Sequence, residues 1–287
     1  MPELPEVETM RRGLLGIVGS TITAVDCPPC ERRPILMEPP VTTIDRRCAS
    51  RRITDIGRRG KRVLIHLDDG QMFIIEPRMT GLVLLVEPPT TAHLRLRIAL
   101  RGRDHAELLF WDRRGLGTVR LLSAAEASAW LDGTTIGPDA LDITAEQLRQ
   151  CYVSSRRAIK VALLDQRNVA GIGNLYAAEI LHLAGVDPRV RCDRLSRPQW
   201  LRIHAAIGEI LRVAILHEGS TLSDGTYRNA LNADGGYQNQ HRVYDREGKA
   251  CSRCVDGIIR RIIQSQRSTF YCPACQRRSG RIRGAVS

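Results

Sequence analysis

Residues 2–9 have the sequence Pro-Glu-Leu-Pro-Glu-Val-Glu-Thr and mark where the first helix of the fold begins. Pro5 suits the first turn of a helix, because proline lacks an N–H at a position where no helical partner exists for one. Glutamates lie at or before that turn, where the helix dipole favours negative charge. Apolar residues then recur at helical spacing, which predicts an amphipathic helix over residues 5–18: Val7, Met10, Leu14 and Ile17.

Pro2 and Glu3 indicate a second role for the same stretch. If Met1 is removed, Pro2 carries a free secondary amine. The pKa of an α-amino group is about 8, far below that of a lysine side chain, so much of this amine is uncharged and nucleophilic at neutral pH. Condensation with an aldehyde-level sugar carbon gives a charged iminium ion, which is an electron sink for elimination. Glu3 is placed beside the amine to carry protons. Glutamates at a helix start more often serve the dipole alone, so both interpretations stay open on these residues.

The unbroken match from Pro2 to Thr9 resembles the N-terminus of the formamidopyrimidine-DNA glycosylase and endonuclease VIII family, and it is most similar to the former branch. The resemblance implies a DNA-formamidopyrimidine glycosylase with abasic-site lyase activity, acting in base excision repair on formamidopyrimidine and 8-oxoguanine. By the same resemblance Pro2 forms a Schiff base, Glu3 protonates the sugar oxygen, and β- and δ-elimination follow. Lys61 is similar to a lysine used in DNA binding and catalysis.

The composition favours a polyanionic partner. The chain has 287 residues with a net charge of +12 and a pI near 9.7, which is typical of nucleic-acid-binding proteins. There is no run of 18 apolar residues and no secretory signal, so we expect no membrane association. Nine cysteines without a signal favour a reducing compartment and metal ligation over disulfides. The resemblance implies damaged double-stranded DNA as that partner, and we expect a monomer in the bacterial-type cytoplasm, held at the nucleoid through this DNA.

The hydrophobic period changes near residue 140. Residues 21–122 alternate with period two and contain turn residues, which predicts a β-sandwich. Beyond this, helical periodicity predicts helices at 143–152, 158–164, 175–184 and 198–216. We expect an α+β multidomain fold with an N-terminal helix. Its predicted parts are a catalytic sandwich (1–125), a linker (126–142), a helix–two-turn–helix DNA-binding domain (143–236), a zinc ribbon (237–278) and a basic tail (279–287).

Two Cys-x-x-Cys pairs near the C-terminus predict a metal site. Cys251 and Cys254 are separated from Cys272 and Cys275 by 17 residues. This spacing is typical of one structural zinc ion held by four thiolates, with no open position for catalysis. Apolar and β-branched segments at 258–263 and 269–271 predict the two strands of a zinc ribbon.

The resemblance also assigns DNA contacts. The glycine-containing loop 165–174 predicts a phosphate cradle, although a plain turn between helices explains it about as well. It is similar to the family's helix–two-turn–helix element, which implies that Asn174 holds phosphate. Counterparts in the family imply DNA-binding roles for Met79, Lys160 and Arg267. We assign His93 to the same group.

Residues 112–117 depart from the family pattern. Where formamidopyrimidine-DNA glycosylases have Asp-Pro-Arg-Arg-Phe-Gly, this chain keeps Arg114 but has Gly115 and Leu116 in the two wedge positions. Leu116 can still fill a gap between bases, whereas Gly115 has no side chain with which to contact the orphaned base. We expect weak opposite-base selectivity, which Gly115→Arg should sharpen.

Two other functions stay open from the sequence. One is an endonuclease VIII-like enzyme for oxidised pyrimidines, because the wedge and the lesion-capping loop at 221–236 are atypical. The other is a damaged-DNA-binding protein without catalysis, although the intact Pro2-Glu3 pair argues against it.

Overall fold

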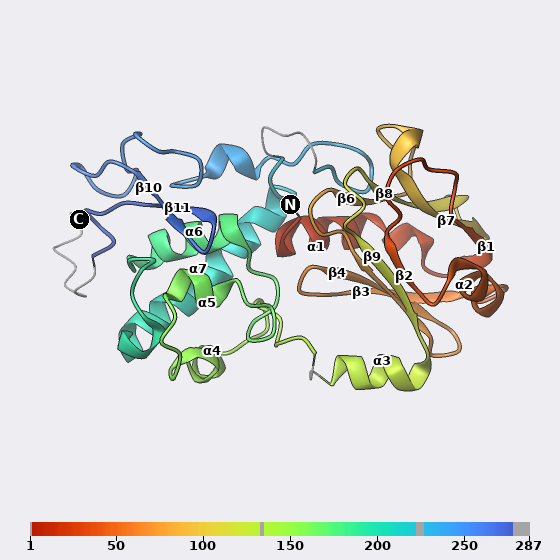
Figure 1. Cartoon of the computed structure of the whole chain (residues 1–287), viewed down its shortest axis with the longest axis horizontal. Coiled ribbons are helices and arrows are strands. Elements are labelled where there is room, and N and C mark those ends of the chain that lie inside the picture. The colour runs from red at the N-terminus through yellow and green to blue at the C-terminus, as the bar shows by residue number, and fades with distance from the viewer. Residues whose placement is uncertain (1, 133–134, 222–226, 278–287) are drawn as a thin grey trace. The chain divides into compact units, whose positions relative to one another are not determined.

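The computed structural model of the chain describes residues 2–132, 135–221 and 227–277 (Figure 1). Contacts between residues divide the chain into two units, and each unit is assembled from two separate segments. The first comprises Met1–Thr134 and Ala214–Gln238, and the second comprises Thr135–Val213 and Asn239–Ser287. The loop 222–226, part of the predicted capping loop, and the whole of the predicted basic tail (279–287) lie outside the described residues. None of the described helices is long and apolar enough to cross a bilayer.

Two sheets form most of the first unit. Four strands run in the order β1-β7-β8-β6 and five in the order β2-β9-β5-β4-β3, and the β2–β9 pair is the parallel one among them. The first sheet consists of β1 Thr21–Asp26, β6 Gly81–Leu84, β7 Leu94–Arg101 and β8 Glu107–Asp112. The second consists of β2 Leu36–Glu38, β3 Ile53–Arg59, β4 Arg62–Leu67, β5 Met72–Glu76 and β9 Thr118–Leu122.

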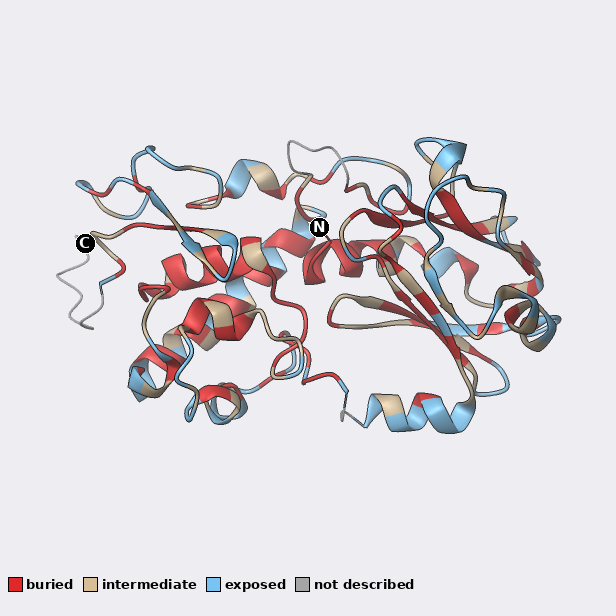
Figure 2. Ribbon diagram, in the orientation of Figure 1, coloured by how far each residue is buried: buried red, intermediate tan, exposed pale blue. Residues whose placement is uncertain are grey.

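The core of the first unit contains apolar side chains from both sheets and from the first helix, so the predicted sandwich with its N-terminal helix is confirmed. Figure 2 shows the first helix largely buried, whereas the strands combine buried residues with half-buried and exposed ones. Strands β4 and β5 pair antiparallel on the two sides of the turn at Gly70. The helices of this unit are α1 Leu4–Gly13, α2 Val41–Cys48 and α3 Ala124–Leu131, with 3-10 turns at Leu15–Ile17 and Thr91–His93.

The first helix is shorter than predicted. It ends at Gly13, and a 3-10 turn carries Ile17 into the core instead of a continuous helix to residue 18. Glycine weakens a helix interior, and three glycines follow one another here: Gly13, Gly16 and Gly19. Gly13 also lies against Ala230, whose Cβ would be 2.4 Å from a Cβ at Gly13. The apolar spacing therefore predicted the buried face correctly but overestimated the length of the helix.

The second unit is helical and carries a β-hairpin. Its helices are α4 Ala145–Tyr152, α5 Ile159–Leu163, α6 Asn174–Ala184 and α7 Arg197–Leu216, whose last residues belong to the first unit. A 3-10 turn spans Cys192–Arg194, and another spans Tyr237–Gln240 where the chain passes between the two units. Strands β10 Arg260–Gln264 and β11 Arg267–Tyr271 pair antiparallel next to the predicted cysteine site. The predicted helical region and ribbon are thus both present.

Candidate functional site

The N-terminal residues are buried and held by the start of α1. Pro2 and Glu3 are both buried, and Glu3 is the residue that precedes the helix. The Glu3 N–H donates to Glu6 Oε2 at 2.8 Å. Pro5 lies in the first turn, as its missing N–H predicts. The backbone that carries the proposed amine and acid is therefore fixed by its own helix.

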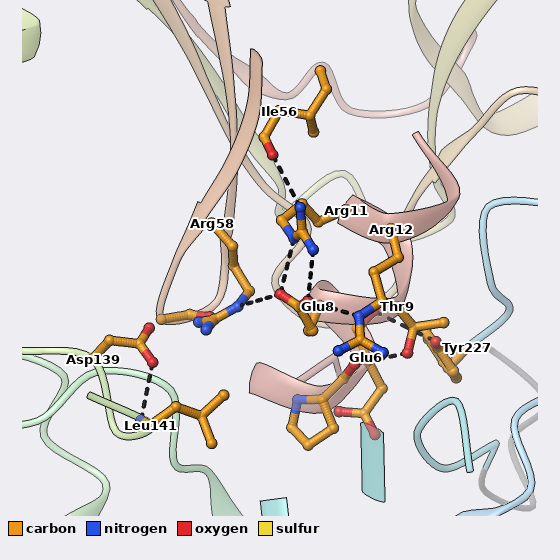
Figure 3. Close-up of polar contacts among 12 residues, drawn as sticks. Glu6, Glu8, Thr9, Arg11, Arg12, Ile56, Arg58, Asp139, Leu141 and Tyr227 are labelled. Carbon is orange, nitrogen blue, oxygen red and sulfur yellow. Dashed lines mark hydrogen bonds and ion pairs between the residues drawn. The ribbon is translucent and has the colours of Figure 1, made fainter. Parts of the chain in front are cut away.

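Glu6 ties this helix start to a segment more than 200 residues away in the chain. Its Oε1 accepts the backbone N–H of Ser220 at 2.8 Å. Gly219 has a φ of +78°, and a Cβ there would lie 2.7 Å from Glu6 Oε1, so only glycine fits. The Tyr227 hydroxyl donates to the Glu218 carbonyl at 2.9 Å. It also reaches the carbonyl of Glu6 (Figure 3). From the sequence, Glu6 was expected only to interact favourably with the helix dipole. No residue near it in the sequence indicates the contact with Ser220.

Glu8 is the centre of a cluster of arginines (Figure 3). Its carboxylate accepts from Arg11, Arg12 and Arg58 at 2.9–3.1 Å. Burial opposes the ionisation of Glu8, but the three guanidinium groups outweigh it and lower the pKa of Glu8 from 4.5 to about 2. Arg58 Nη1 in turn donates to the Gly60 carbonyl at 3.0 Å. The turn that carries Lys61 between β3 and β4 is thereby connected to α1.

Glu8 should make the stability of the protein dependent on acid. A carboxyl whose pKa is lower in the folded state stabilises the fold above its ordinary pKa, and this contribution is lost as the pH falls from about 4.5 towards 2. We expect Glu8→Gln to cost about 1.5–3 kcal/mol at pH 7, the value of a hydrogen bond to a charged group, and to flatten the acid limb of the stability profile. Urea unfolding between pH 7 and 3 measures both. Glu146→Gln, at an exposed ion pair with Arg149, is the control, and an acid limb of Glu8→Gln parallel to wild type would contradict the assignment.

A buried aspartate joins the turn that carries Met79 to the loop that carries Arg114. Asp112 Oδ1 accepts from the Thr80 hydroxyl and from the Arg114 N–H, and Oδ2 accepts the Gly117 N–H at 2.7 Å. The Arg114 N–H also donates to the Thr80 hydroxyl at 3.0 Å. Met79 is half-buried in a turn, and Arg114 is exposed. Asp112 and Thr80 organise this part of the site, and the sequence did not single them out.

Strand β7, which pairs with the strand that leads into this loop, departs from a simple alternation of buried and exposed side chains. Strict alternation with Leu94 and Leu96 would leave Arg95 exposed, but its side chain is buried and its Nε donates to the Asp112 carbonyl at 2.9 Å. A register shift between Leu94 and Leu96 causes this, because a β-bulge re-aims the side chain that it carries. His93 lies just before the strand with its ring edge against Trp111. Burial lowers the pKa of His93, and the positive charges of Arg95 and of further arginines lower it further.

Gly115 is required by the backbone at its position. It is buried with a φ of +61°, and a Cβ there would lie 2.6 Å from the carbonyl oxygen of Arg33. Any side chain would both strain the turn and displace the neighbouring backbone. Leu116 is half-buried beside it. Gly115→Arg is therefore expected to distort the loop, which makes it a poor test of opposite-base contacts.

The second unit brings three of the predicted residues to one region. Lys160 is fully buried, and its Nζ donates to Asn174 Oδ1 at 2.5 Å. Asn174 begins α6, and its Nδ2 donates to the carbonyl of Ser268 at 3.1 Å. Arg267, the exposed neighbour of Ser268, opens β11. The predicted Lys160, Asn174 and Arg267 are thus linked through the hairpin.

Glu179 is a buried residue of α6 that the sequence did not identify. Its carboxylate accepts the backbone N–H groups of Arg242, Val243 and Tyr244 at 2.8–2.9 Å. Burial raises the pKa of Glu179, and the three N–H groups act in the opposite direction. The segment that leads into the cysteine site is thereby fastened to the middle of α6.

The four predicted cysteines converge. Their sulfur atoms all lie within 4.8 Å of one another, with 3.9 Å between Cys251 and Cys275 and 3.6 Å between Cys254 and Cys272. A tetrahedral zinc with Zn–S bonds of about 2.3 Å separates its sulfurs by about 3.8 Å. A Cβ at Gly257 would lie 2.5 Å from the sulfurs of Cys254 and Cys272, so glycine is needed beside the cluster. The donor set and its spacing fit a metal ion held by four thiolates.

Comparisons with known proteins agree with this arrangement. Residues 1–119 match the model of the formamidopyrimidine-DNA glycosylase N-terminal domain, and residues 136–226 match that of the formamidopyrimidine-DNA glycosylase H2TH domain. The formamidopyrimidine-DNA glycosylase of Chloroflexus aggregans is 40% identical over 279 residues, covering 96% of this chain and 98% of that protein.

Solved structures give the same result. The MutM (Fpg) protein of Thermus thermophilus has a TM-score of 0.82 at 34% identity, covering 96% of this chain and 98% of that one. The Lactococcus lactis Fpg, solved in complex with DNA containing an abasic site, has a TM-score of 0.84 at 31% identity, covering 96% and 99%.

Proposed function

This chain belongs to the formamidopyrimidine-DNA glycosylase family of base excision repair, and from that premise we propose that it excises oxidised purines and then cleaves the abasic strand through Pro2. The observation that carries the proposal is the buried Pro2-Glu3 pair, whose backbone is fixed by Glu6 and, through Glu6, by Ser220. A nucleophile held in one geometry gains most of the advantage of an intramolecular reaction.

The proposed reaction begins once Met1 is removed. The Pro2 nitrogen forms a bond to C1′ as the glycosidic bond breaks, and the base leaves with a proton. Glu3 protonates the sugar ring oxygen, which opens the ring and leaves an iminium ion between Pro2 and C1′. Loss of a C2′ proton then breaks the bond to the 3′ phosphate, and a second elimination breaks the bond to the 5′ phosphate. Water finally releases the sugar fragment from Pro2.

The remaining site residues are proposed to hold DNA with its damaged base turned out. Base extrusion costs a few kcal/mol, and Met79, Arg114 and Leu116 are proposed to occupy the void, supported by the Asp112 contacts that join their loops. A second group is proposed to hold phosphates or the extruded nucleotide: Lys61, His93, Lys160, Asn174 and Arg267. We propose that the chain acts on damaged duplex DNA as a monomer.

One structural zinc ion is proposed for the second unit. Cys251, Cys254, Cys272 and Cys275 would hold it as thiolates, and their mutual distances support this. With four protein ligands a zinc ion has no open position, so it would supply folding free energy and no step of the reaction. The thiolates fix the ribbon that carries Arg267 and Ser268 next to α6.

The lesion that the enzyme excises distinguishes the proposed function from its alternatives. A mutant of the Lactococcus lactis Fpg has been solved with DNA containing Fapy-dG, and the wild type has been solved with DNA containing an oxidised pyrimidine. A panel of duplexes with formamidopyrimidine, 8-oxoguanine or an oxidised pyrimidine would test this chain, with excised base and strand cleavage measured separately. Faster excision of the purine lesions is expected. Preference for the pyrimidine would favour the endonuclease VIII-like alternative, and tight binding without any product would favour a non-catalytic protein.

Opposite-base selectivity is expected to be weak. A bidentate contact to a base contributes about 1–3 kcal/mol of discrimination, and Gly115 has no side chain to make one. Excision rates with each of the four bases opposite the lesion should therefore differ by less than about tenfold. Leu116→Ala should lower all four rates together, because an apolar wedge is indifferent to the opposite base.

Arg113→Ala and Arg114→Ala decide whether a neighbour replaces the missing contact, since both side chains are exposed in the same loop. A wild-type enzyme that is strongly selective for cytosine, and that loses this selectivity in one of the two variants, would show that the arginine concerned contacts the opposite base.

A further inference from the structure

The last turn of α6 makes a direct contact with the cysteine cluster. His182 is buried there, with only 1% of its surface exposed, and its Nε2 lies 3.3 Å from Cys251 Sγ. A metal-bound thiolate can only accept a hydrogen bond. The contact is therefore favourable only in the tautomer that carries a hydrogen on Nε2.

A second connection joins the same helix end to the same cysteine pair. Arg253, between Cys251 and Cys254, donates from Nη1 to the carbonyls of His182 and Leu183 at 2.6 and 2.9 Å. Both carbonyls belong to the last helical turn, where carbonyl groups lack the usual partner four residues on, and that of His182 also accepts the N–H of Gly185 at 3.1 Å. The Arg253 N–H also lies 3.4 Å from Cys251 Sγ. Cys251 is thus approached by a backbone donor and by an imidazole donor.

We propose that His182 is a positioning residue of the metal site, which donates a hydrogen bond from Nε2 to the Cys251 thiolate and so retains the metal. The inference rests on the proposed zinc ion. Four thiolates around one Zn²⁺ leave a net charge of −2, and donors to the sulfurs stabilise that charge and fix the ligand orientation. Partners of this outer kind typically change metal affinity by about 10–100-fold.

The contact between His182 and Cys251 is related to Asn174, because both residues belong to α6. Asn174, at the start of α6, is hydrogen-bonded to the β10–β11 hairpin through Ser268, and His182, near its end, is hydrogen-bonded to Cys251. The helix is therefore connected to the ribbon at both ends. Weakening the His182 contact is expected to loosen metal retention first and the grip of Asn174 on phosphate only after the metal is lost.

The test compares two isolated changes in the full-length, zinc-loaded protein. His182→Phe keeps a planar ring but removes the donor, and His182→Gln keeps an N–H at a similar reach to Nε2. Transfer of zinc to the chromogenic chelator 4-(2-pyridylazo)resorcinol gives the affinity. We expect His182→Phe to bind zinc about 10–100-fold more weakly and His182→Gln to remain within a fewfold of wild type.

His204→Phe is the matched control, because His204 is a histidine of the same unit whose Nε2 contacts the Ile143 carbonyl and no cysteine. It should retain zinc like wild type even if its melting temperature falls. In the cobalt-substituted protein, loss of the donor should shift the sulfur-to-cobalt charge-transfer band to lower energy in His182→Phe alone, because the sulfur electrons are then less stabilised. If His182→Phe does not fold, His182→Asn, with a shorter reach, takes its place beside His182→Gln.

Equal zinc affinity and equal spectra in wild type and in the donor-free variant would overturn the role of His182 while leaving the zinc site intact. A wild-type protein that binds no zinc would overturn the proposed metal site itself, and this inference with it.

Discussion

Pro2→Gly is expected to remove most of the protein–DNA adduct that sodium borohydride traps on lesion-containing duplexes. A secondary amine gives an iminium ion directly, and the pyrrolidine ring restrains the nitrogen in the buried position that Pro2 occupies. Glycine retains an amine but loses both properties. A displacement of about 1 Å at a reacting atom can lower a rate by about 100-fold, so the trapped fraction at early times should fall by one to two orders of magnitude.

Two controls make the result specific to the amine. Pro5→Ala changes the other proline of the same stretch, which carries no free amine, and should keep the adduct. Protein that retains Met1 should give none, because the nitrogen of Pro2 is then an amide. An adduct of wild-type strength from Met1-retaining protein would rule out Pro2 as the nucleophile.

Glu3→Gln should lower base excision by about 10²–10⁴-fold, the usual contribution of a general acid, while the dissociation constant for lesion DNA stays nearly unchanged. The carboxyl group is needed only as charge develops on the sugar, so its loss raises the barrier without weakening the bound state. DNA with a preformed abasic site no longer requires departure of a base and should still be trapped. Single-turnover excision and equilibrium binding, measured on the same duplex, separate the two quantities.

Glu6→Gln is the informative comparison for this prediction. Glu6 accepts two backbone N–H groups, from Glu3 and Ser220, and its main role is therefore structural. Its substitution should lower the melting temperature more than Glu3→Gln does. If Glu3→Gln lost DNA affinity as far as it lost rate, Glu3 would be a helix-capping residue and not a proton donor.

Local patterns predicted the parts of this fold that local physics determines. The β4–β5 hairpin follows from the apolar runs 63–67 and 72–75 on the two sides of the turn at Gly70, and α6 follows from its helical period and the glycines before it. The length of α1 was wrong because Gly13 weakens the helix where Ala230 also crowds it, and the contact partner lies far away in the sequence. Likewise the buried Arg95 donates to the carbonyl of Asp112, a partner that the strand pattern of residues 94–100 does not indicate.

The same division applies to the site. The spacing of the four cysteines is typical of one shared metal ion, so their convergence could be predicted from the sequence. The contacts of Glu6 with Ser220, of Glu179 with residues 242–244, and of His182 with Cys251 join positions at least 63 residues apart. Each of these residues looks in isolation like an ordinary helical residue. Only the tertiary structure shows that they support the residues that the motifs name.

The crossing of the chain between units has a consequence for how the protein is made. Tyr227 and Ala230 belong to the apolar core of the first unit, although residues 135–213 of the second unit precede them in the chain. At about 5–20 residues per second, synthesis reaches Ala230 roughly 5–20 s after Thr134. During that interval α1 lacks the neighbour that packs against Gly13, and Glu6 lacks the Ser220 N–H. The sandwich is therefore completed late in translation, and a fragment that ends at Thr134 lacks residues that its own core requires.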